Sequence, residues 1–147
     1  MSKVLAAAIL IAVAMAPAFA QGADPIAARE ALMKQNGKDA KAGGEMLKGV
    51  TPFTAVKAQA IFAGMNDVAN KFGNHFPKGS ETGGDTEAAP AVWTKPAEFK
   101  AALMKFEGDT KAAMAAKPAT LDAFKAQFIT VTGNCKSCHE GFRIKKN

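Results

Sequence analysis

The most restrictive feature of this chain is a five-residue pattern near its C-terminal end, Cys135-Lys136-Ser137-Cys138-His139. On a helix, residues i, i+3 and i+4 share one face, so both thiols and the imidazole point the same way. Cys-x-x-Cys-His is the attachment signature of a c-type haem, in which each thiol bonds to the porphyrin and the histidine binds iron. The chain has no other cysteine. We therefore expect one haem c, held covalently by Cys135 and Cys138, with His139 as an iron ligand.

Two other chemistries use cysteines at this spacing. A thioredoxin-like redox pair belongs in a βαβ setting, and the sequence has no strand-like alternation. A structural zinc site needs four ligands, whereas the only other histidine, His75, has no cysteine near it in the sequence. Haem attachment uses both thiols and the adjacent histidine, so it explains the pattern best.

Four stretches carry the apolar spacing of amphipathic helices. They begin at Asp24-Pro25, Thr51-Pro52, Pro96 and Thr120, where a capping residue or a proline precedes the pattern. The last stretch is the most regular, and its apolar seam runs through both cysteines: Leu121, Phe124, Phe128, Val131, Cys135, Cys138 and Phe142. We predict an all-α fold, an antiparallel four-helix bundle in up-down-up-down order, with haem c on the C-terminal helix and facing the core.

The segment between Gly73 and Val92 is rich in Gly, Pro, Ser and Thr and has no helical period, which predicts a long surface connection. We expect Trp93, just beyond it, to pin this connection to the core or to the cofactor. In the first helical stretch, Gly37 and Gly44 occupy seam positions. Small residues there would let a flat group approach the helix closely.

Residues 1–20 have the pattern of a secretory signal peptide, with Lys3 before an apolar run and Ala18-Phe19-Ala20 as the cleavage site. We expect residues 21–147 to form the mature helical domain, and no later stretch is apolar enough to cross a bilayer. Covalent attachment of c-type haem takes place outside the cytoplasm in bacteria, so a periplasmic location is expected. The formal charge of +6 suits acidic redox partners, whereas the dispersed lysines do not form a nucleic-acid footprint.

A haem motif at the extreme C-terminus, on the last of four helices, resembles the class II cytochromes c, which include cytochromes c′ and c-556. The C-terminal pattern of that family is matched by Cys135-x-x-Cys138-His139-x-x-x-Arg143. The first helix of the c-556 branch is similar to Arg29-x-x-Leu32-Met33-Lys34-x-Asn36-Gly37. The resemblance covers essentially the whole mature chain, except for the connection at 74–90. It also implies that a homodimer is one of the states to expect, since relatives often pair through their first two helices.

The resemblance implies that Met33 is the sixth iron ligand, because the matching position faces the haem and is methionine in the c-556 type. In cytochromes c′ that position is apolar and the iron is open to nitric oxide or carbon monoxide. Helical periodicity alone leaves Met65 as another candidate, and His75 is the one other imidazole. We thus predict a single-electron carrier with His/Met-ligated haem, and a gas-binding protein is the alternative. The chain has no nucleophile–base set and no recognisable carboxylate pair, so we do not expect an enzyme.

Two arginines complete the predicted site. Arg29 lies one turn before Met33 on the same face, where its guanidinium could pair with a haem propionate. The alternative is a surface arginine with acidic neighbours. Arg143 lies one turn beyond His139, and the resemblance favours a role in raising the haem potential. It could also simply stabilise the end of the helix.

Overall fold

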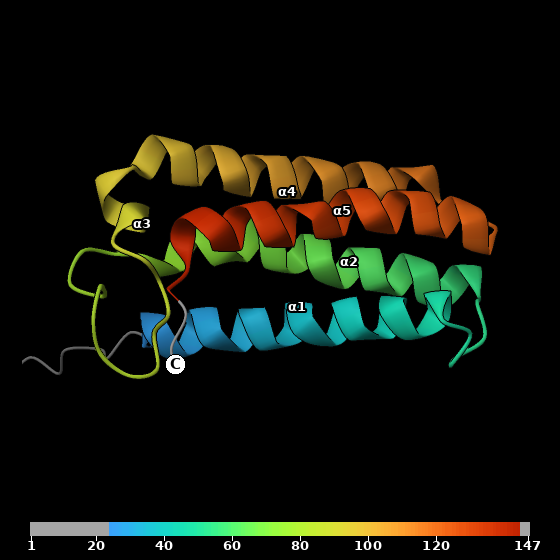
Figure 1. The fold of residues 1–147 in the computed structure, drawn as a ribbon, viewed down its shortest axis with the longest axis horizontal. Coiled ribbons are helices and arrows are strands. Elements are labelled where there is room, and N and C mark those ends of the chain that lie inside the picture. Colours follow the sequence, from blue (N-terminus) through green and yellow to red (C-terminus); the bar gives the residue numbers. More distant parts are fainter. Residues whose placement is uncertain (1–23, 145–147) are drawn as a thin grey trace, which may run out of the picture.

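The computed structural model describes residues 24–144 and consists of helices that pack lengthwise into a bundle (Figure 1). The elements in chain order are α1 (Pro25–Leu47), α2 (Ala55–Phe72), the 3-10 turn η1 (Gly73–His75), α3 (Ala91–Thr94), α4 (Pro96–Ala116) and α5 (Leu121–Phe142). The four long helices run up-down-up-down, so the predicted antiparallel four-helix bundle is confirmed. The predicted signal peptide and residues 145–147 lie outside the described residues. None of the described helices is long and apolar enough to cross a membrane.

One helix start differs from the prediction. The second helix does not begin at Thr51-Pro52, because the Thr51 N–H still donates to the Glu45 carbonyl oxygen (3.4 Å) in the turn that ends α1. The N-cap is Thr54 instead, with an extended backbone and a side-chain oxygen that accepts from the Lys57 N–H (3.1 Å). Thr51 and Thr54 are both residues that can cap a helix. Because Thr51 belongs to the turn after α1, the helix starts after Thr54.

The hydrophobic core fills one half of the bundle, at the end where α1 joins α2 and where α5 begins. Its aromatic centre is a row of rings in which Phe124 lies 5.2 Å from Phe62 and 5.2 Å from Phe128, measured between centroids. The core cluster contains Met46, Ala58, Ile61, Phe62, Met65, Ala113, Phe124, Phe128 and Val131. The cysteine-bearing end of α5 lies beyond this cluster. The other half of the bundle is thus free to hold a different group.

Gly43, which the sequence analysis did not single out, is a glycine at which two helices approach closely. A Cβ at Gly43 would lie 2.2 Å from Cε2 of the Phe128 ring, whereas a Cβ at Gly44 would meet nothing within 4 Å. We predict that Gly43→Ala lowers the free energy of unfolding by about 1–3 kcal/mol through overpacking. Gly44→Ala is the matched control and should raise it by up to about 1 kcal/mol. Urea unfolding of the holoprotein checks both, and equal effects of the two changes would contradict the close contact.

The connection between η1 and α3, residues 76–90, is here called the strap, and it is more ordered than a surface loop. Ser80 and Ala89 within it are buried. The Trp93 indole Nε1 donates to the Phe76 carbonyl oxygen (3.2 Å), which confirms that Trp93 pins this segment. The Phe76 ring in turn packs edge-on against Phe99 of α4 (4.9 Å between centroids). Trp93 itself belongs to the short helix α3, which the sequence pattern did not predict.

Candidate cofactor site

A cavity of about 660 Å³ lies at the strap end of the bundle, within the size range of cofactor sites. Cys135, Cys138 and His139 line it from α5, and Met33 and Arg29 line it from α1. Helix α1 packs mainly against α2, and α5 packs mainly against α4. Because α1 and α5 touch each other little, room is left between them. The fold therefore brings the predicted thiols, histidine and methionine to one cavity.

Most of the other cavity walls are apolar, as a porphyrin requires. They include Ala40, Phe72, Phe76, Ala88, Val92, Phe99, Ala102, Leu103, Phe106 and Phe142. Two buried side-chain oxygens on the wall, Glu30 Oε1 and Asn36 Oδ1, have no hydrogen-bond partner among the described residues. Buried oxygens of this kind normally find a partner, so they fit a site that a cofactor and its ordered water complete. The residues present thus fit haem c.

The two thiols do not have the electrostatics of a redox pair. Burial raises the pKa of Cys135, and burial together with the neighbouring Cys135 raises the pKa of Cys138. Redox-active Cys-x-x-Cys thiols instead have a lowered pKa. Structural zinc needs four ligands, but among residues 24–144 no group of even three His, Cys, Asp or Glu side chains is placed to hold a metal ion. Both competing interpretations of the motif lose support.

His139 is held in the form that binds metal. Desolvation of the imidazole lowers its pKa, the positive charge of Arg143 lowers it further, and Glu87 raises it. A lowered pKa keeps the imidazole neutral at pH 7, as an iron ligand must be. His75, the other imidazole, does not line the cavity. Its carbonyl oxygen accepts from Arg29 Nη1 (3.1 Å).

Met33 is the methionine that lines the cavity. Met65 and Met46 are 0% and 1% exposed and belong to the hydrophobic core at the other end of the bundle. Met104 is 61% exposed, and Met114 packs against that core. Of the methionines in the described part of the chain, Met33 alone shares a cavity with His139, so its location agrees with the predicted role as sixth ligand. The iron bond itself stays a prediction.

Arg143 does not continue the helix as the sequence suggested. Helix α5 ends at Phe142, and Arg143 has an extended backbone (φ −123°, ψ 132°) because it pairs with Ala88 of the strap in an antiparallel bridge. Its Nε donates to the Glu87 carboxylate. Arg143 lines the cavity from this position, so its predicted influence on the haem remains open to test.

Asn134 is a cavity residue that the sequence did not reveal. It is 5% exposed, and its Nδ2 donates to Asp109 Oδ2 of α4 (2.7 Å), which also pairs with Lys105 Nζ. The Asn134 and Lys105 hydrogen bonds lower the pKa of Asp109. The ionised carboxylate thus stabilises the fold above the ordinary pKa of Asp, and this stabilisation disappears as the pH falls through the lowered pKa.

We predict that Asp109→Asn lowers the free energy of unfolding by about 1–2 kcal/mol at pH 7, because it weakens a charge-assisted hydrogen bond between α4 and α5. The loss should shrink as the pH falls from neutral through the lowered pKa of Asp109, where the wild-type carboxylate becomes protonated as well. Urea unfolding of both holoproteins across this pH range is the measurement. Asp67→Asn, at an exposed ion pair within α2, is the control and should change stability little. A pH-independent loss for Asp109→Asn would refute the linkage.

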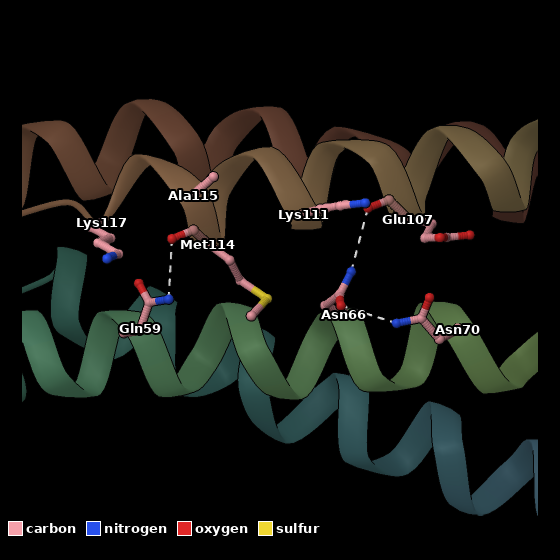
Figure 2. A pocket seen from close by; sticks show the side chains of 8 residues that line it. All are labelled: Gln59, Asn66, Asn70, Glu107, Lys111, Met114, Ala115 and Lys117. Atoms are coloured by element: carbon pink, nitrogen blue, oxygen red, sulfur yellow. Dashed lines mark hydrogen bonds between the residues drawn. The ribbon is translucent and has the colours of Figure 1, made fainter.

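A second hollow, of about 490 Å³, lies between α2 and α4 and has different chemistry (Figure 2). Six of the eight residues that line it are polar or charged, and Gln59 Nε2 reaches across it to donate to the Met114 carbonyl oxygen (3.1 Å). Asn66 Nδ2 likewise donates to Thr110 Oγ1 of α4 (2.9 Å). These amides join the two helices, and neither cysteine nor histidine lines the hollow.

Comparison with known proteins agrees with the site. A family model described as Cytochrome C′ matches residues 24–143. A cytochrome c′ from Rhodopseudomonas palustris is 40% identical over 126 residues, 84% of each chain, and a cytochrome c-556 from Agrobacterium fabrum is 34% identical over 98% of this chain and 97% of its own. The solved structure of cytochrome c′ from Rhodopseudomonas palustris superposes with a TM-score of 0.81 at 38% identity and covers 86% of this chain and 100% of its own.

The family model covers nearly all the described residues, and both c′ and c-556 proteins are among the relatives. The Cys-x-x-Cys-His motif faces an apolar cavity large enough for a cofactor. These findings agree with the resemblance drawn from the motif and its position. The chain belongs to the cytochrome c′ family, and its cofactor is haem c.

Proposed function

We propose that this protein carries single electrons through a haem held by His139 and Met33. The observation that carries the proposal is that Met33 of α1 lines the same cavity as His139 of α5, whereas Met65, the other candidate, is buried in the core. Bound haem c supplies an iron atom that alternates between the ferrous and ferric states. His139 and Met33 are the residues that would hold that iron. A thioether ligand also favours the reduced state, which raises the potential.

The chain's own residues favour electron transfer over turnover. The cavity walls are mainly apolar, which limits reorganisation around the site when its charge changes. With Met33 on the iron, no coordination position remains for a substrate. The basic surface charge would attract acidic redox partner proteins. We infer that the protein works in the periplasm, because the N-terminal pattern and the haem attachment both require export, and that a homodimer is compatible with this role.

A second function, binding of nitric oxide or carbon monoxide at open iron, has its own support. The relative with 40% identity is named cytochrome c′. The family resemblance implies that in this type the position matching Met33 is apolar and the iron is open. If Met33 only packs over the haem, the apolar cavity would admit a small gas. The two functions differ in the occupancy of one coordination position.

The optical spectrum of the purified holoprotein separates the two. His/Met ligation predicts a sharp low-spin α-band in the reduced protein and a weak sulfur-to-iron charge-transfer band in the near infrared of the oxidised protein. A high-spin spectrum in both oxidation states would reject the electron-carrier proposal and support gas binding.

A further inference from the structure

One buried residue, Arg29, fastens the strap to α1. Its Nη1 donates to the His75 carbonyl oxygen (3.1 Å) and to Ser80 Oγ (3.0 Å). Its Nη2 donates to the Ser80 carbonyl oxygen (2.7 Å) and to Thr86 Oγ1 (2.5 Å). Arg29 is 4% exposed, and a guanidinium has four terminal N–H groups, so all four have protein acceptors and only the Nε–H remains. A bidentate pair with a propionate through these groups would require Arg29 to release the strap.

Aromatic packing supports the same arrangement. The Arg29 guanidinium lies 4.9 Å from the ring centroid of Phe76 and 5.7 Å from that of Trp93, which are within the range of cation–π contacts. Planar stacking and a fork of donors are properties of arginine that lysine lacks. The strap thus depends on the shape of this side chain as well as on its charge.

The next residues of the strap are fastened to α5. Arg143 Nε donates to the Glu87 carboxylate, immediately after the Thr86 that Arg29 holds. The backbone is joined as well: the Ala89 N–H donates to the Phe142 carbonyl oxygen (2.9 Å), and the Ile144 N–H donates to the Glu87 carbonyl oxygen (2.8 Å). Adjacent strap residues are therefore tied to opposite walls of the cavity.

We propose that the strap is a brace between α1 and α5, and that Arg29 and Arg143 are positioning residues that fix the separation of Met33 from His139. The two helices have little direct contact and are otherwise held relative to each other mainly through α2 and α4, so the strap is the direct link across the cavity. The inference rests on the proposed His/Met ligation and gives the long connection a function. It also assigns the terminal nitrogens of Arg29 to the strap instead of a propionate.

The test compares holoprotein variants that separate the charge of Arg29 from its shape. Arg29→Lys keeps the positive charge but loses the fork, and Ser80→Ala with Thr86→Val removes two acceptors and leaves Arg29 intact. Lys78→Gln changes an exposed strap residue and is the matched control. Three quantities are measured: hydrogen exchange of the strap amides, the near-infrared charge-transfer band of the oxidised protein, and the rate of carbon monoxide binding to the reduced protein.

With a working brace, Arg29→Lys should speed exchange of the strap amides at least about tenfold, weaken the charge-transfer band and accelerate carbon monoxide binding. The Ser80→Ala, Thr86→Val variant should change all three in the same direction, and it decides the question if Arg29→Lys does not fold. Lys78→Gln should match the wild type. These outcomes would support a positioning role that charge alone cannot supply.

Two results would overturn the brace. If Arg29→Lys keeps wild-type exchange and spectrum, positive charge suffices, as expected of a propionate partner. If the strap amides of the variants exchange faster while the charge-transfer band and the carbon monoxide rate stay unchanged, Arg29 fastens the strap, but the strap does not position Met33 relative to His139. A high-spin wild type would refute the His/Met function instead, and exchange and carbon monoxide binding in the variants would still decide whether the brace controls access to the iron.

Discussion

Replacing Met33 with leucine should convert the haem from low-spin to high-spin and open it to carbon monoxide. Leucine has nearly the same volume as methionine, so the fold should lose less than about 1.5 kcal/mol of stability. Its side chain cannot bind iron. Carbon monoxide must displace the thioether in the wild type. Its apparent affinity there is the intrinsic affinity multiplied by the small fraction of protein in which Met33 has left the iron. If that fraction is about 1–10%, Met33→Leu should bind carbon monoxide about 10–100-fold more tightly.

Met65→Leu is the matched control, because Met65 is fully buried in the core and does not line the cavity. This variant should keep the wild-type spectrum and potential. A low-spin wild type that ignores Met33→Leu but responds to Met65→Leu would move the ligand to α2. Loss of the thioether should also lower the reduction potential in Met33→Leu, which a spectroelectrochemical titration would measure.

The parts of the structure that follow from local chemistry were predictable from the sequence. The seam from Phe124 through Cys138 fixes which face of α5 turns inward, because side chains spaced three and four apart share one face. The same periodicity placed Met33 on the inner face of α1. It could not choose between Met33 and Met65, since both lie on seams. Only packing shows that one seam position faces the cavity and the other faces the core.

The features that the sequence missed arise from contacts between distant segments. Arg143 appeared to continue α5, but pairing with Ala88 pulls its backbone into an extended conformation. The strap has no periodic pattern, so nothing local shows that Arg29 organises it. Asn134 is the exception with a usable signal: it lies three residues after the buried Val131, and a polar residue at such a position indicates a hydrogen-bonded partner in the interior.

Removing both attachment points, in a Cys135→Ala, Cys138→Ala double variant, should turn the protein into a loose helical state. The cysteines line a cavity of about 660 Å³. Without the haem, the apolar walls of this cavity would lose the group that they pack against, and apolar surface left in water costs about 25 cal/mol per Å². The cavity half of the bundle must therefore collapse or fill with water, and either change loosens the packing of α1 against α5.

Helical content in the far ultraviolet should largely persist, because α1, α2, α4 and α5 are amphipathic. Near-ultraviolet circular dichroism should weaken, since Trp93 and Phe76 pack beside the cavity, and thermal melting should lose its sharp transition. Lys136→Gln changes an exposed residue between the two cysteines and should melt like the wild type. A sharp, native-like melt of the double variant would mean that the core at the other end of the bundle, around Phe62 and Phe124, holds the fold without the cofactor.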